Sequence, residues 1–346
     1  MLNAFPGAPV YTSVYDPERT FPEFRDVDVR TTALNRVRAL RENHRLAFPL
    51  LAPAMSLLRI DADVVLCSSS GWAHGVATHG RKVVYCHAPA RWLYQPERYE
   101  ERLAMAGRAA LTALRPALKA WDARSVRGAG LYLANSRHVA AALLACHGIR
   151  AEVLSPPPAL TPLGPQRPVE TIEPGFFLCV SRLLPYKNVD EVAAAFARLE
   201  GERLVVVGRG PDEERIRALA GTNVSLLNKA EDDELRWLYA NCTAVVAAAY
   251  EDFGLTPIEA AAFGKPTATL RFGGFLDTLR EGVTGLHFDR PTRDTIAQAL
   301  LEVKAREWAP AVLMEHAARF SEERFVDRLR EIVSREAKDI GLGAAA

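Results

Sequence analysis

Short apolar runs and longer amphipathic stretches alternate along the second half of the chain. The apolar runs predict strands at 176–180, 203–207, 224–227 and 244–248. Helical spacing between and after them predicts helices at 189–199, 212–219, 231–241 and 257–263. Strands that alternate with helices in this way form a parallel sheet covered by helices on both faces.

The first half has a similar but less regular pattern. Apolar strands are predicted at 64–68, 82–86 and 131–135, with helices at 35–46, 98–129 and 137–147. A proline-rich stretch follows, and because proline cannot continue a helix or a central strand, it indicates a linker. We therefore expect four parts: an N-terminal domain at 1–158, a linker at 159–174, a C-terminal domain at 175–320, and a final helix at 322–335 within a tail at 321–346.

Composition fits two ordinary globular domains. The chain has 346 residues, of which 49% are hydrophobic and 25% are charged, so each domain can bury its own core. The five cysteines are odd in number, widely spaced and mostly set in apolar runs, which favours buried thiols over a metal cluster or a disulfide framework. No signal peptide is recognisable, and no apolar run reaches the roughly 20 residues that a spanning helix needs. We expect a cytoplasmic protein that contacts the inner face of the membrane at most peripherally, with no metal, cofactor or nucleic acid.

The strongest functional pattern follows the predicted strand at 244–248. Two carboxylates, Glu251 and Glu259, lie eight positions apart and flank a predicted helix start. The free backbone N–H groups at such a start, near Leu255 and Thr256, favour a phosphate, and Gly254 lets a ligand approach the backbone closely. Thr256 and Glu259 fit a capping box equally well, in which the glutamate accepts a hydrogen bond from the N-cap amide.

A second pattern follows the predicted strand at 176–180. Arg182 and Lys187 are two cations five residues apart in the loop beyond the strand. Fixed cations stabilise the negative charge that grows on a nucleoside diphosphate when its bond to a sugar breaks. In isolation, the same two residues are also compatible with an ordinary solvated loop.

A third candidate is His87, which directly follows the predicted strand at 82–86. A histidine at a strand end is compatible both with a functional imidazole and with an ordinary packed side chain.

Three sequence runs carry a family resemblance. The runs EDFGLTPIEAAAFGKP, SRLLPYKNVDEVAAAF and HAPARW resemble the Glu-x7-Glu, Arg/Lys and His-x-Pro-x-Arg segments of family 4 retaining glycosyltransferases. The likeness extends from Ala4 to about Val333 and is strongest to the branch of O-antigen and capsule mannosyltransferases. It implies the GT-B fold, in which two Rossmann-like, doubly wound parallel-sheet domains face a cleft.

The resemblance also implies a role for each candidate. Arg182 and Lys187 hold the diphosphate, helped by backbone amides near Leu255 and Thr256. Glu259 binds the ribose hydroxyls, while Glu251 and His87 position the sugar.

The resemblance is incomplete at the start of the chain. Family members begin with a strand, a Gly-Gly loop and a helix, whereas residues 1–11 resemble the end of that helix and the second strand. Either the start lies further upstream or the protein is a natural truncation. In the second case the N-terminal sheet lacks a central strand, and neighbouring strands leave backbone groups unpaired.

Charge divides unevenly between the two halves. Residues 1–170 contain 21 Lys and Arg against 14 Asp and Glu, a net charge of +7, and the remainder carries −6. Four arginines, Arg36, Arg38, Arg41 and Arg45, precede the apolar run 46–51. This stretch is compatible with a solvated helix face, with contact to anionic lipid, or with a pyrophosphate-linked acceptor.

The sequence therefore predicts a retaining enzyme that transfers a hexose from a nucleotide sugar, for which GDP-mannose is a candidate, to a saccharide or lipid-linked saccharide in surface polysaccharide or glycoconjugate synthesis. The alternative is a non-catalytic protein, either sugar-nucleotide-binding or a scaffold, derived from such an enzyme by loss of its first strand.

Overall fold

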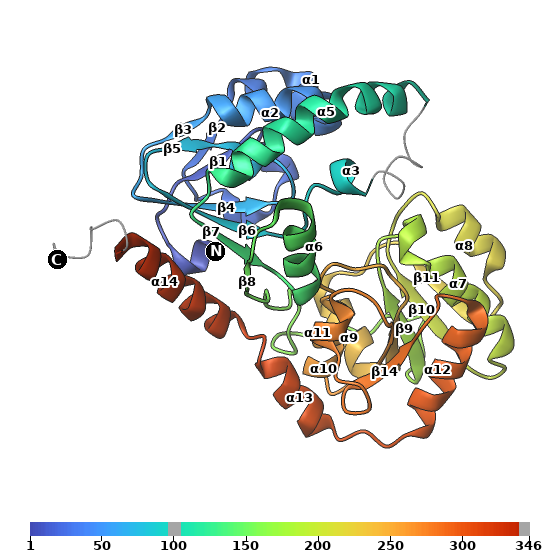
Figure 1. The fold of residues 1–346 in the computed structure, drawn as a ribbon. Coiled ribbons are helices and arrows are strands. Elements are labelled where there is room, and N and C mark those ends of the chain that lie inside the picture. The colour runs from blue at the N-terminus through green and yellow to red at the C-terminus, as the bar shows by residue number, and fades with distance from the viewer. Residues whose placement is uncertain (96–104, 339–346) are drawn as a thin grey trace. The chain divides into compact units, whose positions relative to one another are not determined.

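The computed structural model describes residues 1–95 and 105–338, and the chain forms two compact units (Figure 1). Unit 1 contains Met1–Asn135, Val139–Leu154 and Val326–Ala346, and unit 2 contains Ser136–His138 and Ser155–Phe325. Within the described ranges, no helix is long and apolar enough to cross a membrane.

Unit 2 is built on one parallel sheet of six strands. The strands are β9 (Phe176–Val180), β10 (Leu204–Val207), β11 (Val224–Leu227), β12 (Cys242–Ala247), β13 (Thr267–Leu270) and β14 (Gly285–Phe288). Their order is β11-β10-β9-β12-β13-β14, so the chain steps outward in one direction from β9 and in the other from β12. Such a reversal is a topological switch point, where open α/β sheets bind ligands beyond the carboxyl ends of the strands.

Both faces of this sheet are covered because its strands are apolar on both sides. Phe177 and Cys179 point toward helices α7 (Val189–Ala195), α8 (Glu213–Leu219) and α12 (Arg293–Ala305). Phe176 and Leu178 point toward α9 (Asp232–Asn241) and α10 (Thr256–Ala262). Figure 1 shows these two helix layers on opposite sides of the strands. The predicted doubly wound architecture of this half is confirmed.

Several elements of unit 2 complete the fold around that sheet. The sequence analysis did not predict β13, β14, α12 or the helix α13 (Pro310–Ala318). The short helix α11 (Phe275–Thr278) follows the loop after β13. Helix α14 (Glu322–Lys338) begins in unit 2 and ends in unit 1. Short 3-10 turns η7 (Pro185–Lys187) and η8 (Phe196–Arg198) flank α7.

The segment expected to be a linker packs into unit 2. The two units divide after Leu154, and residues 159–174 belong to unit 2. Leu160 and Ile172 are buried among the side chains of α9 and β9. These two apolar residues explain why the proline-rich stretch is held against the domain.

Unit 1 has a parallel sheet of four strands, in the order β4 (Val64–Ser69), β6 (Arg81–Cys86), β7 (Leu131–Ala134) and β8 (Glu152–Val153). Helices α5 (Met105–Arg127) and α6 (Arg137–His147) bury apolar side chains against it. Two further parallel pairs are β1 (Val10–Thr12) with β2 (Val29–Thr31), and β3 (Arg59–Ile60) with β5 (Ala77–Thr78). Short elements complete the unit: η1 (Leu2–Ala4), η2 (Pro17–Arg19), η3 (Pro22–Phe24), η6 (Ala73–Gly75) and α3 (Arg91–Tyr94).

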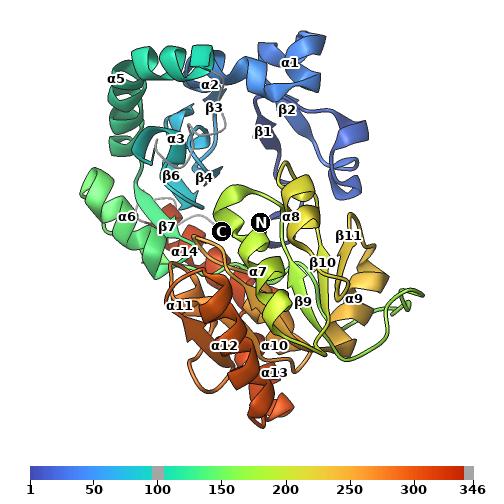
Figure 2. The same cartoon turned by 90° about the vertical axis from the view of Figure 1, so that its right-hand side faces the viewer.

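The sheet of unit 1 is interrupted. Within the described residues, β1 pairs only with β2, and β4 pairs only with β6. Figure 2 shows β1 and β2 apart from β4 and β6. The β1–β2 pair is therefore not joined to the four-stranded sheet within the described residues, and the absence of a family strand from the start of the chain stays a prediction.

The helix predicted at 35–46 does not form as one element. The chain instead makes η4 (Ala33–Arg36), α1 (Arg38–Glu42) and η5 (His44–Ala47), followed by the unpredicted helix α2 (Phe48–Leu57). The breaks fall at Val37 and Asn43, whose ψ angles of 107° and 82° are not helical. Asn35, in η4, is held by a contact distant in sequence, because its side-chain oxygen accepts a hydrogen bond from the amide of Tyr15 at 2.8 Å. Tertiary contacts of this kind override local helix propensity.

Candidate active site

The two predicted phosphate and sugar motifs meet at the switch point of unit 2. One follows β9 and the other follows β12, and these strands are neighbours in the sheet. The amide of Tyr250 donates to the carbonyl oxygen of Tyr186 at 3.1 Å. The side-chain amide of Asn188 donates to the carbonyl oxygen of Ala248 at 2.7 Å. The sheet order therefore places two loops side by side that are far apart in sequence.

Lys187 and Glu251 form an ion pair at this junction. The Lys187 ammonium donates to Oε1 of Glu251, and only 8% of Lys187 is exposed. Lys187 ends the η7 turn, and Asn188 follows it in the left-handed conformation with φ 51°. This sharp reversal lets α7 begin at Val189, immediately after Asn188. The two candidates lie in one charge-paired cluster.

Arg182 lies beside the same cluster but is exposed. Its guanidinium donates to the hydroxyl oxygen of Tyr186 at 3.3 Å. The ring of Tyr186 also lies 5.1 Å from Nζ of Lys187, measured to the ring centroid. The tyrosine therefore contacts both cations, and the sequence analysis did not identify it.

The segment Gly254-Leu255-Thr256 leads from Glu251 into α10. The helix begins at Thr256 with Leu255 as its N-cap, one residue earlier than the predicted Thr256 cap. Gly254 has φ +83°, and a Cβ there would lie 2.5 Å from the ring of Phe275. Glycine is thus required by the turn and by Phe275, and a close approach of ligand to Gly254 stays a prediction.

A second glycine turn holds the Glu251 loop. Gly273 has φ +59°, and a Cβ at this position would lie 2.0 Å from the carbonyl oxygen of Glu251. The amide of Gly274 donates to that same oxygen at 3.0 Å. The loop after β13 therefore fixes the backbone from which the Glu251 carboxylate projects.

The side chain of Glu259 does not bond to the N-cap amide, as a capping box would require, but to other groups. The structure has no side-chain cap at the start of α10, so that alternative is wrong. Oε2 of Glu259 instead accepts a hydrogen bond from the hydroxyl of Tyr239 at 2.9 Å, and the backbone of Ala159 and Leu160 also bonds to the carboxyl group. Burial raises the pKa of Glu259, and these hydrogen bonds only partly oppose it.

The raised pKa of Glu259 predicts a pH-dependent stability. Because folded Glu259 binds its proton more tightly than the unfolded chain does, its contribution to stability is full below the unfolded pKa and is lost as pH rises through the folded pKa. We expect Glu259→Gln to gain thermal stability relative to the wild type between about pH 4 and pH 7. Circular dichroism melts across this range test the expectation. Glu307→Gln, at an exposed site of unit 2, should track the wild type. A difference in melting temperature between Glu259→Gln and the wild type that stays constant across this pH range would contradict the expected pH dependence.

His87 belongs to unit 1 and directly follows β6. Its Nε2 lies 2.8 Å from Oγ of Ser68, and its backbone amide donates to the carbonyl oxygen of Ser69 at 2.9 Å. The side-chain amide of Asn135 donates to the carbonyl oxygen of His87 at 3.0 Å. The ends of β4, β6 and β7 thus hold the imidazole at the carboxyl edge of the sheet. Partial desolvation lowers its pKa, which favours the neutral ring at pH 7.

Unit 1 also contains a buried polar network that the sequence analysis missed. Asp122 accepts from Tyr94 at 2.7 Å and lies 2.9 Å from Nε2 of His74 and 3.4 Å from Nε2 of His147. Nδ1 of His74 lies 3.0 Å from Oγ of Ser69. Ser69, His74 and Asp122 contact one another in the same order as the residues of a hydrolase triad, but the likeness ends there. At most 5% of each of the three residues is exposed, so a substrate could not reach the hydroxyl.

Comparison with known proteins shows what the chain is similar to. Residues 165–324, which form most of unit 2, match the family described as glycosyl transferases group 1. The fold is similar to that of sucrose-phosphate synthase from Thermosynechococcus elongatus, with a TM-score of 0.69 and 18% identity over 95% of this chain and 88% of the other. It is also similar to Anabaena Alr3699/HepE in complex with UDP and glucose, with a TM-score of 0.64 and 17% identity over 90% and 87%. The fold is GT-B, and residues 165–324 of unit 2 are similar to group 1 glycosyl transferases.

The curated relatives named below match less than half of this chain. Sucrose synthase from Acidithiobacillus caldus is 30% identical over 45% of this chain and 24% of its own length. D-inositol 3-phosphate glycosyltransferase from Mycolicibacterium smegmatis is 32% identical over 46% and 40%. A GDP-mannose-dependent alpha-(1-6)-phosphatidylinositol monomannoside mannosyltransferase from Mycobacterium tuberculosis is 31% identical over 36% and 37%. The match therefore spans less than half the length of each of these relatives.

Proposed function

We propose that this protein is a retaining glycosyltransferase that moves a hexose from a nucleotide sugar to a saccharide or lipid-linked saccharide acceptor. The observation that carries the proposal is the pairing of Lys187 with Glu251 at the switch point of the unit 2 sheet. A cation and a carboxylate held at this edge suit a ligand with a diphosphate and a sugar. GDP-mannose is the first donor to test, because one relative is a GDP-mannose-dependent enzyme.

The proposed chemistry assigns a task to each group. As the bond between sugar and diphosphate breaks, negative charge grows on the leaving phosphate, and Lys187 and Arg182 stabilise it. Glu251 orients the Lys187 ammonium and lies next to the sugar. The acceptor hydroxyl attacks from the face that the phosphate leaves, so the phosphate helps to take up the acceptor's proton. His87 contributes a neutral imidazole to the hydroxyls of the sugar.

The alternative, a non-catalytic scaffold, has less support. Burying a lysine beside a carboxylate costs desolvation free energy that a well-packed apolar pair would avoid. A scaffold that only presents surfaces has no use for such a pair beside the exposed Arg182. We therefore place the scaffold second.

Calorimetric titration of the full chain with GDP, UDP and ADP, and then with GDP-mannose and UDP-glucose, tests the proposal. We expect one nucleotide to bind and its sugar conjugate to support transfer to an acceptor. If none of these ligands bound to the folded protein, the scaffold would become the better description.

Arg182→Ala should weaken binding of that nucleotide by about tenfold or more, since a charged hydrogen bond to phosphate is lost. Arg182 is exposed, so the variant should fold normally. Arg319→Ala removes an exposed arginine from the end of α13 and should bind as the wild type does. Equal affinities for the two variants would remove Arg182 from the donor site.

A further inference from the structure

Helix α2 of unit 1 presents apolar side chains on two opposite faces. Its inner face packs into the domain through Leu51, Ala52 and Met55, and Phe48 lies against Trp72 and Trp92 with ring centroids 5.3 and 4.8 Å apart. The helix is therefore fixed in place by its own core contacts.

The outer face of α2 is equally apolar and is exposed. Leu50 is 44% exposed, Leu57 is 81% exposed, and the exposed Pro53 lies between them at helical spacing. Leu46, just before the helix, is 56% exposed. The sequence of α2, FPLLAPAMSL, contains no charged residue. An ordinary surface helix carries polar residues on this side.

Cations lie directly before this apolar face. Arg36, Arg38 and Arg41 fall in η4 and α1, and α1 packs on η5, which in turn packs on α2. Arg38 pairs with Glu42, whereas the exposed Arg36 guanidinium makes no hydrogen bond or ion pair within the described chain.

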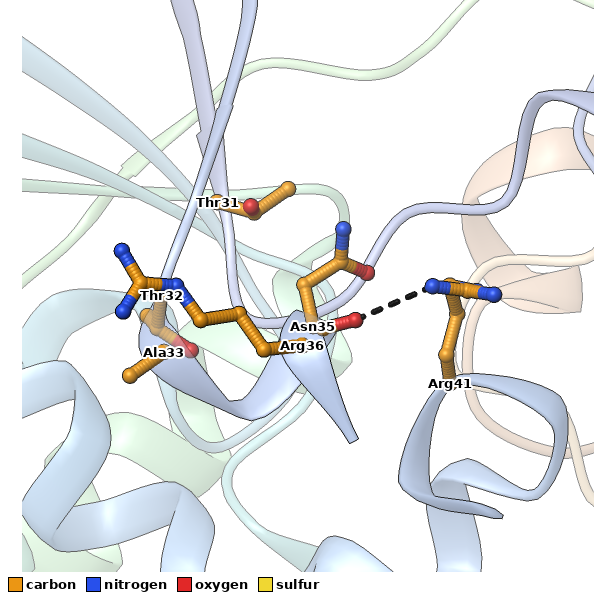
Figure 3. A pocket seen from close by; sticks show the side chains of 6 residues that line it. All are labelled: Thr31, Thr32, Ala33, Asn35, Arg36 and Arg41. Atoms are coloured by element: carbon orange, nitrogen blue, oxygen red, sulfur yellow. Dashed lines mark hydrogen bonds between the residues drawn. The ribbon is translucent and has the colours of Figure 1, made fainter. Parts of the chain in front are cut away.

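Two of these arginines line a small polar cavity. It has a volume of ≈ 420 Å³, and its walls are Thr31, Thr32, Ala33, Asn35, Arg36 and Arg41. Figure 3 shows Arg41 directed at the backbone oxygen of Asn35, 3.2 Å away, and Arg36 extending in the opposite direction. The end of β2 thus carries polar groups and positive charge that suit an anionic headgroup.

We propose that α2 and the η4–α1 arginines form a docking surface for an anionic phospholipid bilayer. Leu46, Leu50 and Leu57 enter the boundary between headgroups and acyl chains, and Arg36 and Arg41 contact headgroup phosphates. The positive charge favours an anionic bilayer over a neutral partner. Arginines of η4 and α1 precede the apolar face and are complementary to an anionic surface. Helix α2 has only 10 residues, so it lies in the plane of the interface.

Cosedimentation with vesicles tests this surface. The full chain should bind vesicles of equal parts phosphatidylglycerol and phosphatidylcholine, and should bind pure phosphatidylcholine vesicles much more weakly. The double substitution Leu50→Gln and Leu57→Gln should lower the partition coefficient by about tenfold or more. Arg36→Gln should lower it by about fivefold, with a smaller loss at high salt.

Leu163→Gln is the matched control, because Leu163 is 82% exposed and lies in unit 2. It should bind vesicles as the wild type does. Circular dichroism melts of all variants show whether they fold equally well. Three results would overturn the proposal: no binding of the wild type to anionic vesicles at low salt, unchanged binding of the double leucine variant, or a self-associating wild type that the leucine substitutions convert to monomers.

Discussion

Replacing Lys187 by alanine should reduce hexose transfer by about 100- to 1,000-fold in kcat, the usual cost of removing one group that stabilises charge in the transition state. Lys187 is buried, and its ammonium is held by Glu251 at the switch point. Water that enters in place of the lysine side chain carries no positive charge and cannot replace it. Initial rates with a saturating donor measure the effect.

The same substitution leaves Glu251 without this partner, so lower stability could imitate lower catalysis. The double variant Lys187→Met and Glu251→Gln removes both charges and keeps the approximate side-chain volumes. It should recover the thermal stability that Lys187→Ala loses and stay inactive. Transfer by a folded Lys187→Ala variant at the wild-type rate would refute the assignment.

Asp122→Ala should destabilise unit 1 by about 3 kcal/mol, the range expected when buried polar groups lose their shared acceptor. The carboxylate contacts Tyr94, His74 and His147 at 3.4 Å or less, and only 2% of it is exposed. Alanine leaves all of these groups without that acceptor. Urea unfolding followed by tryptophan fluorescence, to which the adjacent Trp121 contributes, measures the loss.

Asp28→Ala is the matched control for this experiment. Asp28 pairs with Arg30 on the surface of the same unit, and both side chains are 56% exposed. Exposed pairs contribute little to stability, so the urea midpoint should hardly move. An Asp122→Ala midpoint as close to the wild type as that of Asp28→Ala would show that the network is not structural support.

The part of the site that the sequence predicts best lies at the ends of regular strands. The runs before Arg182 and Glu251 are short and apolar, so both residues were expected at carboxyl ends of a parallel sheet. The structure brings the Glu251 loop and Lys187 together because β9 and β12 are adjacent. Strand adjacency follows from topology, which the resemblance to family 4 supplied.

The contacts that the sequence did not predict depend on packing between distant side chains. Tyr239 reaches Glu259 from α9 to α10, and His74 reaches Asp122 across 48 positions. No local pattern marks such pairs. The helix predicted at 35–46 is divided in a region held by another distant contact, because the side chain of Asn35 bonds to the backbone of Tyr15, 20 positions earlier. Residues 98–104 of the helix predicted at 98–129 lie outside the described residues, and α5 forms the helix over Met105–Arg127, two residues short of the predicted end.

The left-handed turn at Asn188 restricts which amino acids this position can hold. Its backbone, at φ 51° and ψ 34°, excludes β-branched residues and admits mainly glycine, asparagine and aspartate. Its side chain must also donate a hydrogen bond to Ala248, which neither glycine nor aspartate can do. A saturation library selected for transfer should therefore return asparagine at 188 far above every other residue.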